Sequence, residues 1–309
     1  MRSFSDLRYF CEYIVKKYGS PANASEDDKA QEFRSIYLKN MTLDIRTLRA
    51  VASACGIRVN GIDSNVFPEN IRGYHDVFEE NRNIYYKKGD TRSGIENTIL
   101  HEFREMIEPV FAEISPDYSP LKTNAVHLAA NKFATAVLLP RDEFREKVYE
   151  SGFDVISLSK HYSKSCSQVL LRMGEVLQEK VFFYGALYEI NPENNEWKLN
   201  YWTGSANNDD LDANVNGVDG LFPKKGRSVE PGSLVDMTIQ RKRPHIVERI
   251  TLLDSRDDEG LVAIARPLNI SGATAKVALI VVMGLNRNLL TPQVERAKPV
   301  NIEEFHRHL

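Results

Sequence analysis

The sequence is poor in cysteine and contains no long hydrophobic run. Its three cysteines, Cys11, Cys55 and Cys166, are widely spaced and form no C-x-x-C pair. This excludes a disulfide framework and a thiolate zinc site, and it favours reduced thiols in the core. No apolar stretch approaches the roughly 20 residues that a membrane span requires. The amino-terminal segment lacks the apolar centre of a secretory signal, so we expect a cytoplasmic protein with no membrane partner.

An excess of one charge is also absent. The chain of 309 residues has a formal net charge of −3, which gives no global attraction to nucleic acid. DNA or RNA binding would therefore need a local basic face. The hydrophobic content of 42% and the charged content of 27% are ordinary for a globular protein. Its length suits two or three domains of about 100 to 150 residues each.

The most informative feature that is present is the segment His101-Glu-Phe-Arg-Glu105, which differs by one residue from the zinc-protease signature H-E-x-x-H. Residues four apart share one helix face, so His101 and Glu105 can bind one metal ion with Glu102 beside it. Because the second ligand is a carboxylate, the missing imidazole must come from elsewhere, and His127 is the candidate. These two imidazoles and one carboxylate are a zinc-hydrolase ligand set, with Glu102 as the general base.

Two other interpretations remain open for these residues. A His-Glu pair followed by a glutamate is common on solvated helices, so the motif could be an exposed charged stripe. His127 lies in the apolar run from Ala125 to Leu139, where a histidine can be a hydrogen-bonded core residue. The apolar content of the helix favours a metal site, because buried polar side chains need partners. We expect Glu108, one turn further on, to cap the helix or face solvent.

The first half of the chain has the pattern of helices around a small sheet. The spacing of Leu7, Phe10, Cys11 and Ile14 predicts a helix, and a polar stretch follows it over residues 20–28. The further predicted elements are a helix over 43–55 that stops at Gly56, strands at 57–59, 71–78 and 84–86, a helix over 92–108 closed by Pro109, and a helix over 124–139.

The second half begins with a helix-turn-helix-like segment, residues 158–173, with Ser163 in the turn and Ser165 as the cap of the second helix. Its basic residues, Lys160, Lys164 and Arg172, form no clustered stripe, so its attraction for phosphates is modest. Packing against the core of the predicted peptidase domain, or holding a substrate protein, is favoured over DNA binding. After residue 181 the pattern changes to alternating and β-branched runs at 182–190, 197–202, 246–250, 261–265 and 277–283, which predict an antiparallel sheet.

Several stretches resemble the ImmA/IrrE family of metallopeptidases. Ile71-Arg-Gly73 and Asn83-Ile-Tyr85 are similar to strands of that family. In the family H-E-x-x-H follows these strands, where this sequence has His101-Glu-Phe-Arg-Glu105. The run from His127 to Pro140 is similar to the family's E-x-x-A-N-x-F-A-x-x-L-L-x-P helix. The resemblance covers about residues 43–175. His127 stands where the family has its third ligand, a glutamate, and Glu105 stands where it has its second histidine.

The resemblance implies an α+β architecture like that of the longer, stress-response members. The expected parts are a helical extension (1–42), a zincin-like, mostly helical metallopeptidase domain with a small β-sheet (43–145), a helix-turn-helix-like segment (146–179) and a GAF-like α/β sensor domain with a polar carboxyl-terminal tail (180–309). The metal would be Zn²⁺, with Mn²⁺ or another divalent ion as alternatives, and the sensor domain would bind an unidentified small molecule.

The function that the resemblance implies is cleavage of a helix-turn-helix repressor in a stress response or in the control of a mobile element. The alternative is a catalytically inactive regulator that uses the same scaffold to bind a protein partner or DNA. The exchanged ligands keep this alternative open, since they change which helix carries the carboxylate.

Overall fold

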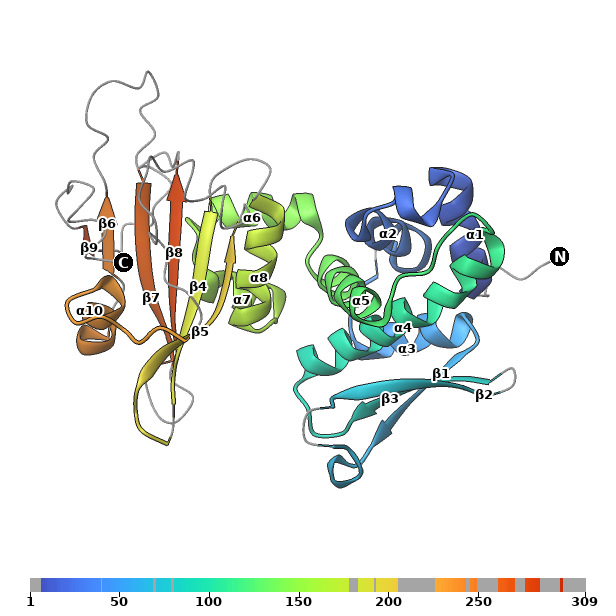
Figure 1. The fold of residues 1–309 in the computed structure, drawn as a ribbon, viewed down its shortest axis with the longest axis horizontal. Helices are drawn as coiled ribbons and strands as arrows, with labels where there is room; N and C mark the ends of the chain where they lie inside the picture. Colours follow the sequence, from blue (N-terminus) through green and yellow to red (C-terminus); the bar gives the residue numbers. More distant parts are fainter. Residues whose placement is uncertain are drawn as a thin grey trace, which may run out of the picture. The chain divides into compact units, whose positions relative to one another are not determined.

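The computed structural model describes residues 7–39, 41–68, 71–78, 81–177, 183–191, 193–204, 226–242, 245–248, 261–269, 276–283 and 295–296. The chain divides into two compact units, Met1–Arg141 and Asp142–Leu309, and each is described by itself (Figure 1).

The amino-terminal unit has an aromatic core between helices. Phe33 lies edge-on to Phe103 and to Phe133, with ring centroids 5.1 and 5.6 Å apart, and Phe10 packs beside it. Edge-to-face contacts are a preferred geometry of aromatic pairs, so this core holds four helices together. The helices of this unit are α1 (Leu7–Tyr18), α2 (Glu26–Phe33), α3 (Ile45–Ala54), α4 (Arg92–Ile114) and α5 (Thr123–Leu138), with short 3-10 helices at Pro21–Asn23 and Ser64–Val66 and a π-helical segment at Arg34–Leu38.

A three-stranded sheet packs beside these helices. Its strands are β1 (Ile57–Ile62), β2 (Gly73–Phe78) and β3 (Asn81–Lys87), in the order β1-β3-β2, with β1 parallel and β2 antiparallel to β3. The edge strand β2 also contacts α4. A Cβ atom at Gly73 would lie 2.2 Å from Thr98 Cγ2 of α4, so glycine allows the strand to approach the helix closely.

The helices and strands predicted for this unit are present, with two differences. The helix predicted to close at Pro109 continues to Ile114. Pro109 is exposed, whereas Val110 and Phe111 beyond it are buried, so core packing outweighs the lost hydrogen bond of the proline nitrogen. Helix α2 begins inside the predicted polar stretch, where Ser25 and Asp28 form a capping box.

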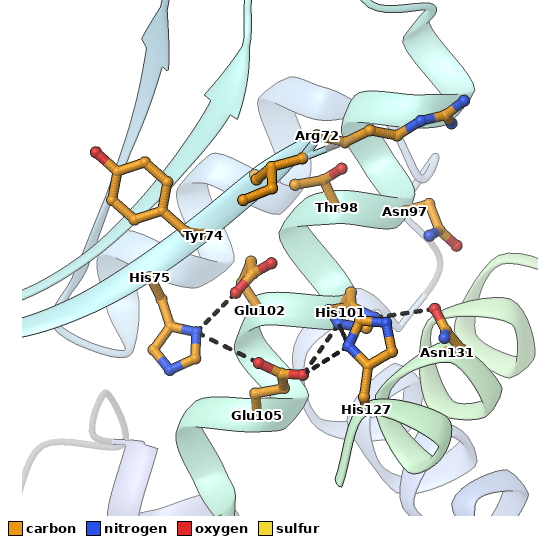
Figure 2. A pocket seen from close by; sticks show the side chains of 12 residues that line it. Arg72, Tyr74, His75, Asn97, Thr98, His101, Glu102, Glu105, His127 and Asn131 are labelled. Atoms are coloured by element: carbon orange, nitrogen blue, oxygen red, sulfur yellow. Dashed lines mark hydrogen bonds and ion pairs between the residues drawn. The ribbon is translucent and has the colours of Figure 1, made fainter. Parts of the chain in front are cut away.

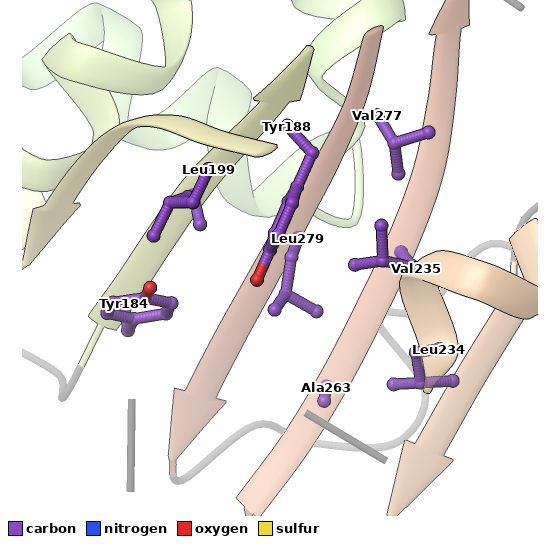
Figure 3. Packing of buried hydrophobic residues seen from close by; sticks show 10 residues of the cluster. Tyr184, Tyr188, Leu199, Leu234, Val235, Ala263, Val277 and Leu279 are labelled. Atoms are coloured by element: carbon purple, nitrogen blue, oxygen red, sulfur yellow. The ribbon is translucent and has the colours of Figure 1, made fainter. Parts of the chain in front are cut away.

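The second unit is a six-stranded sheet with helices on both faces. Leu170 of α8 approaches Gly185 on one face of β4, while Tyr184 and Tyr188 point to the other face, where α10 packs (Figure 3). The strand order is β5-β4-β8-β7-β6-β9. The elements are α6 (Arg141–Glu150), α7 (Val155–Tyr162), α8 (Cys166–Leu177), β4 (Phe183–Ile190), β5 (Trp197–Gly204), α10 (Leu234–Arg241), β6 (His245–Glu248), β7 (Leu261–Asn269), β8 (Lys276–Met283) and β9 (Glu295–Arg296).

The predicted helix-turn-helix-like segment corresponds to α7 and α8. Ser163 ends α7 in the left-handed conformation, with φ of 53°, and the Ser165 hydroxyl accepts a hydrogen bond from the backbone nitrogen of Gln168 at 3.2 Å. Helix α8 packs against β4 and β5, and Lys164 and Arg172 are only 8% and 1% exposed. The second helix is therefore part of the core of this unit, and two of the three basic residues cannot face a phosphate backbone.

The predicted polar tail, residues 286–309, lies outside the described residues except for β9. Across the part of the chain that the structure describes, no helix combines the length and the apolar character needed to cross a membrane.

Candidate metal centre

Helix α4 carries three of the four predicted site residues. Its first turn is capped by Thr91, whose hydroxyl accepts a hydrogen bond from the backbone nitrogen of Gly94 at 3.1 Å. His101 and Glu102 are each 7% exposed, so the motif is not an exposed charged stripe. Glu105, one turn after His101, is 21% exposed in its side chain.

The structure brings His101, Glu105 and His127 together. His101 Nε2 lies 3.1 Å from Glu105 Oε1 and 3.1 Å from His127 Nδ1, and the last two atoms are 3.2 Å apart (Figure 2). His127 comes from the exposed first half of α5, and its side chain is 65% exposed. The interpretation of His127 as a buried core histidine is therefore wrong.

This triangle fits a divalent metal ion. Ligand bonds of about 2.0 to 2.1 Å in tetrahedral geometry place donor atoms about 3.3 Å apart, close to the distances between these three atoms. The donors are two imidazole nitrogens and one carboxylate oxygen, a set that zinc accepts and that leaves one position open.

Asn131 orients the first ligand from α5. Its side-chain oxygen accepts a hydrogen bond from His101 Nδ1 at 3.0 Å. With the proton on Nδ1, the lone pair of Nε2 faces Glu105 Oε1 and His127 Nδ1. These three atoms lie too close together for all of them to present lone pairs to one another, so either an N–H hydrogen or a metal ion lies between them. A hydrogen bond from an outer residue to a metal-binding histidine is a common feature of such sites.

The charge on Glu105 is stabilised by its neighbours. The hydrogen bond with His101 lowers the pKa of Glu105 to about 2, with further lowering from His127 and His75 and an opposing effect of burial. Glu105 is thus a carboxylate at any pH where the protein is folded and its histidines can act as ligands.

Glu102 does not stand alone beside this triangle, since His75 of β2 lies against it. His75 Nδ1 is 2.7 Å from Glu102 Oε2 and 3.8 Å from Glu105 Oε2. The hydrogen bond to Glu102 raises the pKa of His75 above its usual 6.5. Oxygen Oε1 of Glu102 has no protein partner among the described residues. No motif in the sequence marks His75, and its one signal is the alternation along β2 that puts it on the same face as Gly73.

A cavity of about 440 Å³ opens onto these side chains. One wall is β2, whose His75 points toward Glu102 and Glu105, and the opposite wall is α5, which presents His127 and Asn131 (Figure 2). The floor is α4, with His101, Glu102 and Glu105. The full lining is Ile71, Arg72, Gly73, Tyr74, His75, Asn97, Thr98, His101, Glu102, Glu105, His127 and Asn131.

Glu108 belongs to a separate buried ion-pair network, and the expectation that it caps the helix or faces solvent is wrong. It is 4% exposed, and its oxygens accept hydrogen bonds from Arg104, from the Tyr118 hydroxyl and from the backbone nitrogen of Leu121. The guanidinium of Arg104 also bonds both oxygens of Glu26 in α2. This network ties the α4–α5 loop and α2 to α4, and it leaves Glu108 outside the cavity.

Comparison with known families identifies the part of the chain that carries this site. Residues 52–173 match the IrrE N-terminal-like domain. The match, to the Peptidase_M78 family, contains the three-stranded sheet, α4 and α5 and extends into α8. No curated protein sequence matches the chain. A solved structure of a Mycobacterium tuberculosis transcriptional regulator is similar in fold, with a TM-score of 0.50 and 14% sequence identity over 89% of this chain and 80% of that chain.

The match supports a metallopeptidase-type domain, and the site supplies groups that can hold a metal ion. In the structure Glu105 Oε1 of α4 and His127 Nδ1 of α5 lie 3.2 Å apart, so both helices contribute to one point within the matched region.

Proposed function

We propose that this protein is a metal-dependent regulatory endopeptidase, with His101, Glu105 and His127 as metal ligands and Glu102 as the catalytic base. The observation that carries this proposal is the triangle of ligand atoms, which lie 3.1 to 3.2 Å apart at the floor of an open cavity. The carboxylate of Glu102 is next to the triangle, because Glu102 follows His101 on α4.

In peptide hydrolysis the metal ligands, Glu102 and His75 would have separate roles. A bound divalent ion, Zn²⁺ or Mn²⁺, supplies Lewis-acid chemistry: it makes water more acidic and polarises a carbonyl group. Glu102 Oε1, which faces no protein donor among the described residues, accepts the proton of the attacking water and delivers it to the departing amine. His75 holds the other oxygen of Glu102 at 2.7 Å and so orients the carboxylate.

The walls of the cavity suit an extended polypeptide substrate. β2 is an edge strand, so its outer edge can pair with a substrate strand, as in other cases of peptide recognition by strand addition. Ile71 of the cavity lining is 41% exposed, which offers an apolar contact to such a substrate. We propose a helix-turn-helix repressor as the substrate, on the strength of the resemblance to the ImmA/IrrE family.

For the second unit we propose a GAF-like sensor role, in which an unidentified small molecule controls cleavage during a stress response or the response of a mobile element. Its support is a sheet with helices on both faces, together with the fold shared with a transcriptional regulator. We place its action in the reducing cytoplasm, where the buried thiols of Cys11 and Cys55, which form no disulfide, stay reduced.

The alternative is a catalytically inactive regulator that binds a protein partner. DNA binding is disfavoured as its activity, because Lys164 in the turn before α8 and Arg172 within α8 are both buried and offer no basic surface to the phosphate backbone.

Replacement of Glu102 by glutamine tests the proposal. The amide cannot accept a proton, so Glu102→Gln should retain the metal of the His101 group and lose about 100- to 10,000-fold in cleavage rate. The assay is cleavage of an internally quenched peptide library by Zn²⁺- or Mn²⁺-loaded protein, followed by mass analysis of helix-turn-helix repressors from the same genome. The control is Glu193→Gln, in an exposed turn of the second unit. Unchanged turnover in Glu102→Gln would remove Glu102 from the mechanism.

A further inference from the structure

Glu105 faces two different groups of potential ligands with its two oxygens. Oε1 belongs to the triangle with His101 and His127, whereas Oε2 lies 3.8 Å from His75 Nδ1 (Figure 2). His75, Glu102 and Glu105 form a second set in which one donor atom from each residue lies within 4.8 Å of the others. Glu105 is the member common to both sets.

The second set has the chemistry of a divalent-ion site. It offers one imidazole nitrogen and two carboxylate oxygens, donors that suit Mn²⁺, Zn²⁺ and similar ions. His75 Nδ1 and Glu102 Oε2, 2.7 Å apart, share a proton in this structure. A cation can replace that proton when the two side chains move apart slightly, and the cavity beside them gives room for this movement.

The exchange of ligand types gives Glu105 a capacity that histidine lacks at this position. A carboxylate can bind one ion through each of its oxygens, whereas an imidazole offers one lone pair toward the cavity. Two-metal hydrolytic sites hold their ions about 3.5 to 4 Å apart, a separation that a bridging carboxylate allows. The H-E-x-x-E sequence and the placement of His75 are independent features of this chain, and both point to the same arrangement.

We propose that the cavity binds two divalent metal ions bridged by Glu105, the first held by His101 and His127 and the second by His75 and Glu102 Oε2. The inference deepens the proposed function, because it adds an ion to the same site. Glu102 Oε1 stays available as the base. His75 thereby becomes a metal ligand as well as a residue that orients Glu102.

Metal stoichiometry tests the two-ion site without any measurement of activity. Full-length protein purified without a histidine tag is loaded with Mn²⁺ or Zn²⁺, desalted and analysed by mass spectrometry of its metal content. We expect about two equivalents in the wild type and about one in His75→Ala. Glu105→His should also hold one, since imidazole cannot bridge, and Glu105→Ala should lose both. His161→Ala, an exposed histidine of α7, is the matched control and should keep two.

Electron paramagnetic resonance of the Mn²⁺-loaded protein adds a readout specific to a bridged pair. Exchange-coupled ions give a signal that isolated Mn²⁺ does not, and His75→Ala and Glu105→His should abolish it while circular dichroism shows that both variants remain folded. One equivalent in the wild type, or two in folded His75→Ala, overturns the inference. One equivalent with normal peptide cleavage refutes the second site alone, whereas two equivalents without cleavage refute the proposed peptidase function alone.

Discussion

Exchanging the side chains of Glu105 and His127, to give the ligand order of the ImmA/IrrE family that the sequence resembles, is the sharpest test of how these two residues act together. The double change Glu105→His with His127→Glu keeps two imidazoles and one carboxylate, so it should keep metal affinity. Glu105→His alone gives three imidazoles, and His127→Glu alone gives two carboxylates, so each single change should weaken binding. The reach is adequate at position 105, because Nε2 of a histidine there is as many bonds from Cα as the glutamate oxygen it replaces. At position 127 a glutamate oxygen is one bond further from Cα than the Nδ1 of His127, so the longer side chain can reach the same point by bending.

The magnitude follows from the contact between the two residues. Their ligand atoms are 3.2 Å apart, well inside the range of about 7 to 10 Å beyond which mutational effects usually add. If each single change weakens binding tenfold, each costs about 1.4 kcal/mol. Recovery in the double variant then requires a coupling free energy of about 2.8 kcal/mol, within the range of about 0.5 to 3 kcal/mol found for residues in contact.

The assay is competition of the protein with a fluorescent chelator for Zn²⁺. It is carried out on a His75→Ala background, so that only the triangle with His101 contributes. Glu193→His, in an exposed turn, controls for adventitious binding by an added imidazole. If the two single changes prove additive in the double variant, or leave the dissociation constant unchanged, Glu105 and His127 do not share an ion and the metal site is refuted.

Two further predictions concern stability. In metal-free protein, the pKa of Glu105 is lowered from 4.5 to about 2, so stability due to its charge is present above pH 4.5 and is lost as the pH falls toward 2. Urea unfolding at several pH values should show this loss in the wild type and not in Glu105→Gln. In the second unit, a Cβ at Gly174 would lie 2.1 Å from Thr203 Oγ1, so Gly174→Ala should destabilise the unit by about 1 to 3 kcal/mol. Adding Thr203→Ala should recover part of that loss in thermal unfolding; a neutral Gly174→Ala would contradict the packing of α8 on the sheet.

The part of the site that the sequence predicts is the part that depends on helical spacing. A separation of four residues determines that His101 and Glu105 share a face whatever the rest of the chain does. His127 could be predicted as the third ligand because it lies on a helix whose small residues allow close packing against α4. Local signals such as caps, glycine and proline also predict the ends of the helices. The exception is α4, which continues beyond Pro109 because Val110 and Phe111 are buried. A proline can be read from the local sequence, whereas the tertiary packing that continues the helix beyond it depends on residues far away in the chain.

The part that the sequence does not predict is set by strand register. β2 pairs with β3 so that His75 lies opposite Ile84, and this register turns His75 toward α4 with Gly73. A shift of one residue would turn Tyr74 toward the helix and His75 away from it, and no local motif distinguishes the two. The role of Glu105 depends on the same choice. With His75 on the far face its second oxygen would face no imidazole from β2, and H-E-x-x-E would be only a variant ligand set. With His75 on the near face, the carboxylate of Glu105 lies between two sets of donors. A glutamate at position 105 can then bridge two metal ions, as proposed above, whereas a histidine there could not.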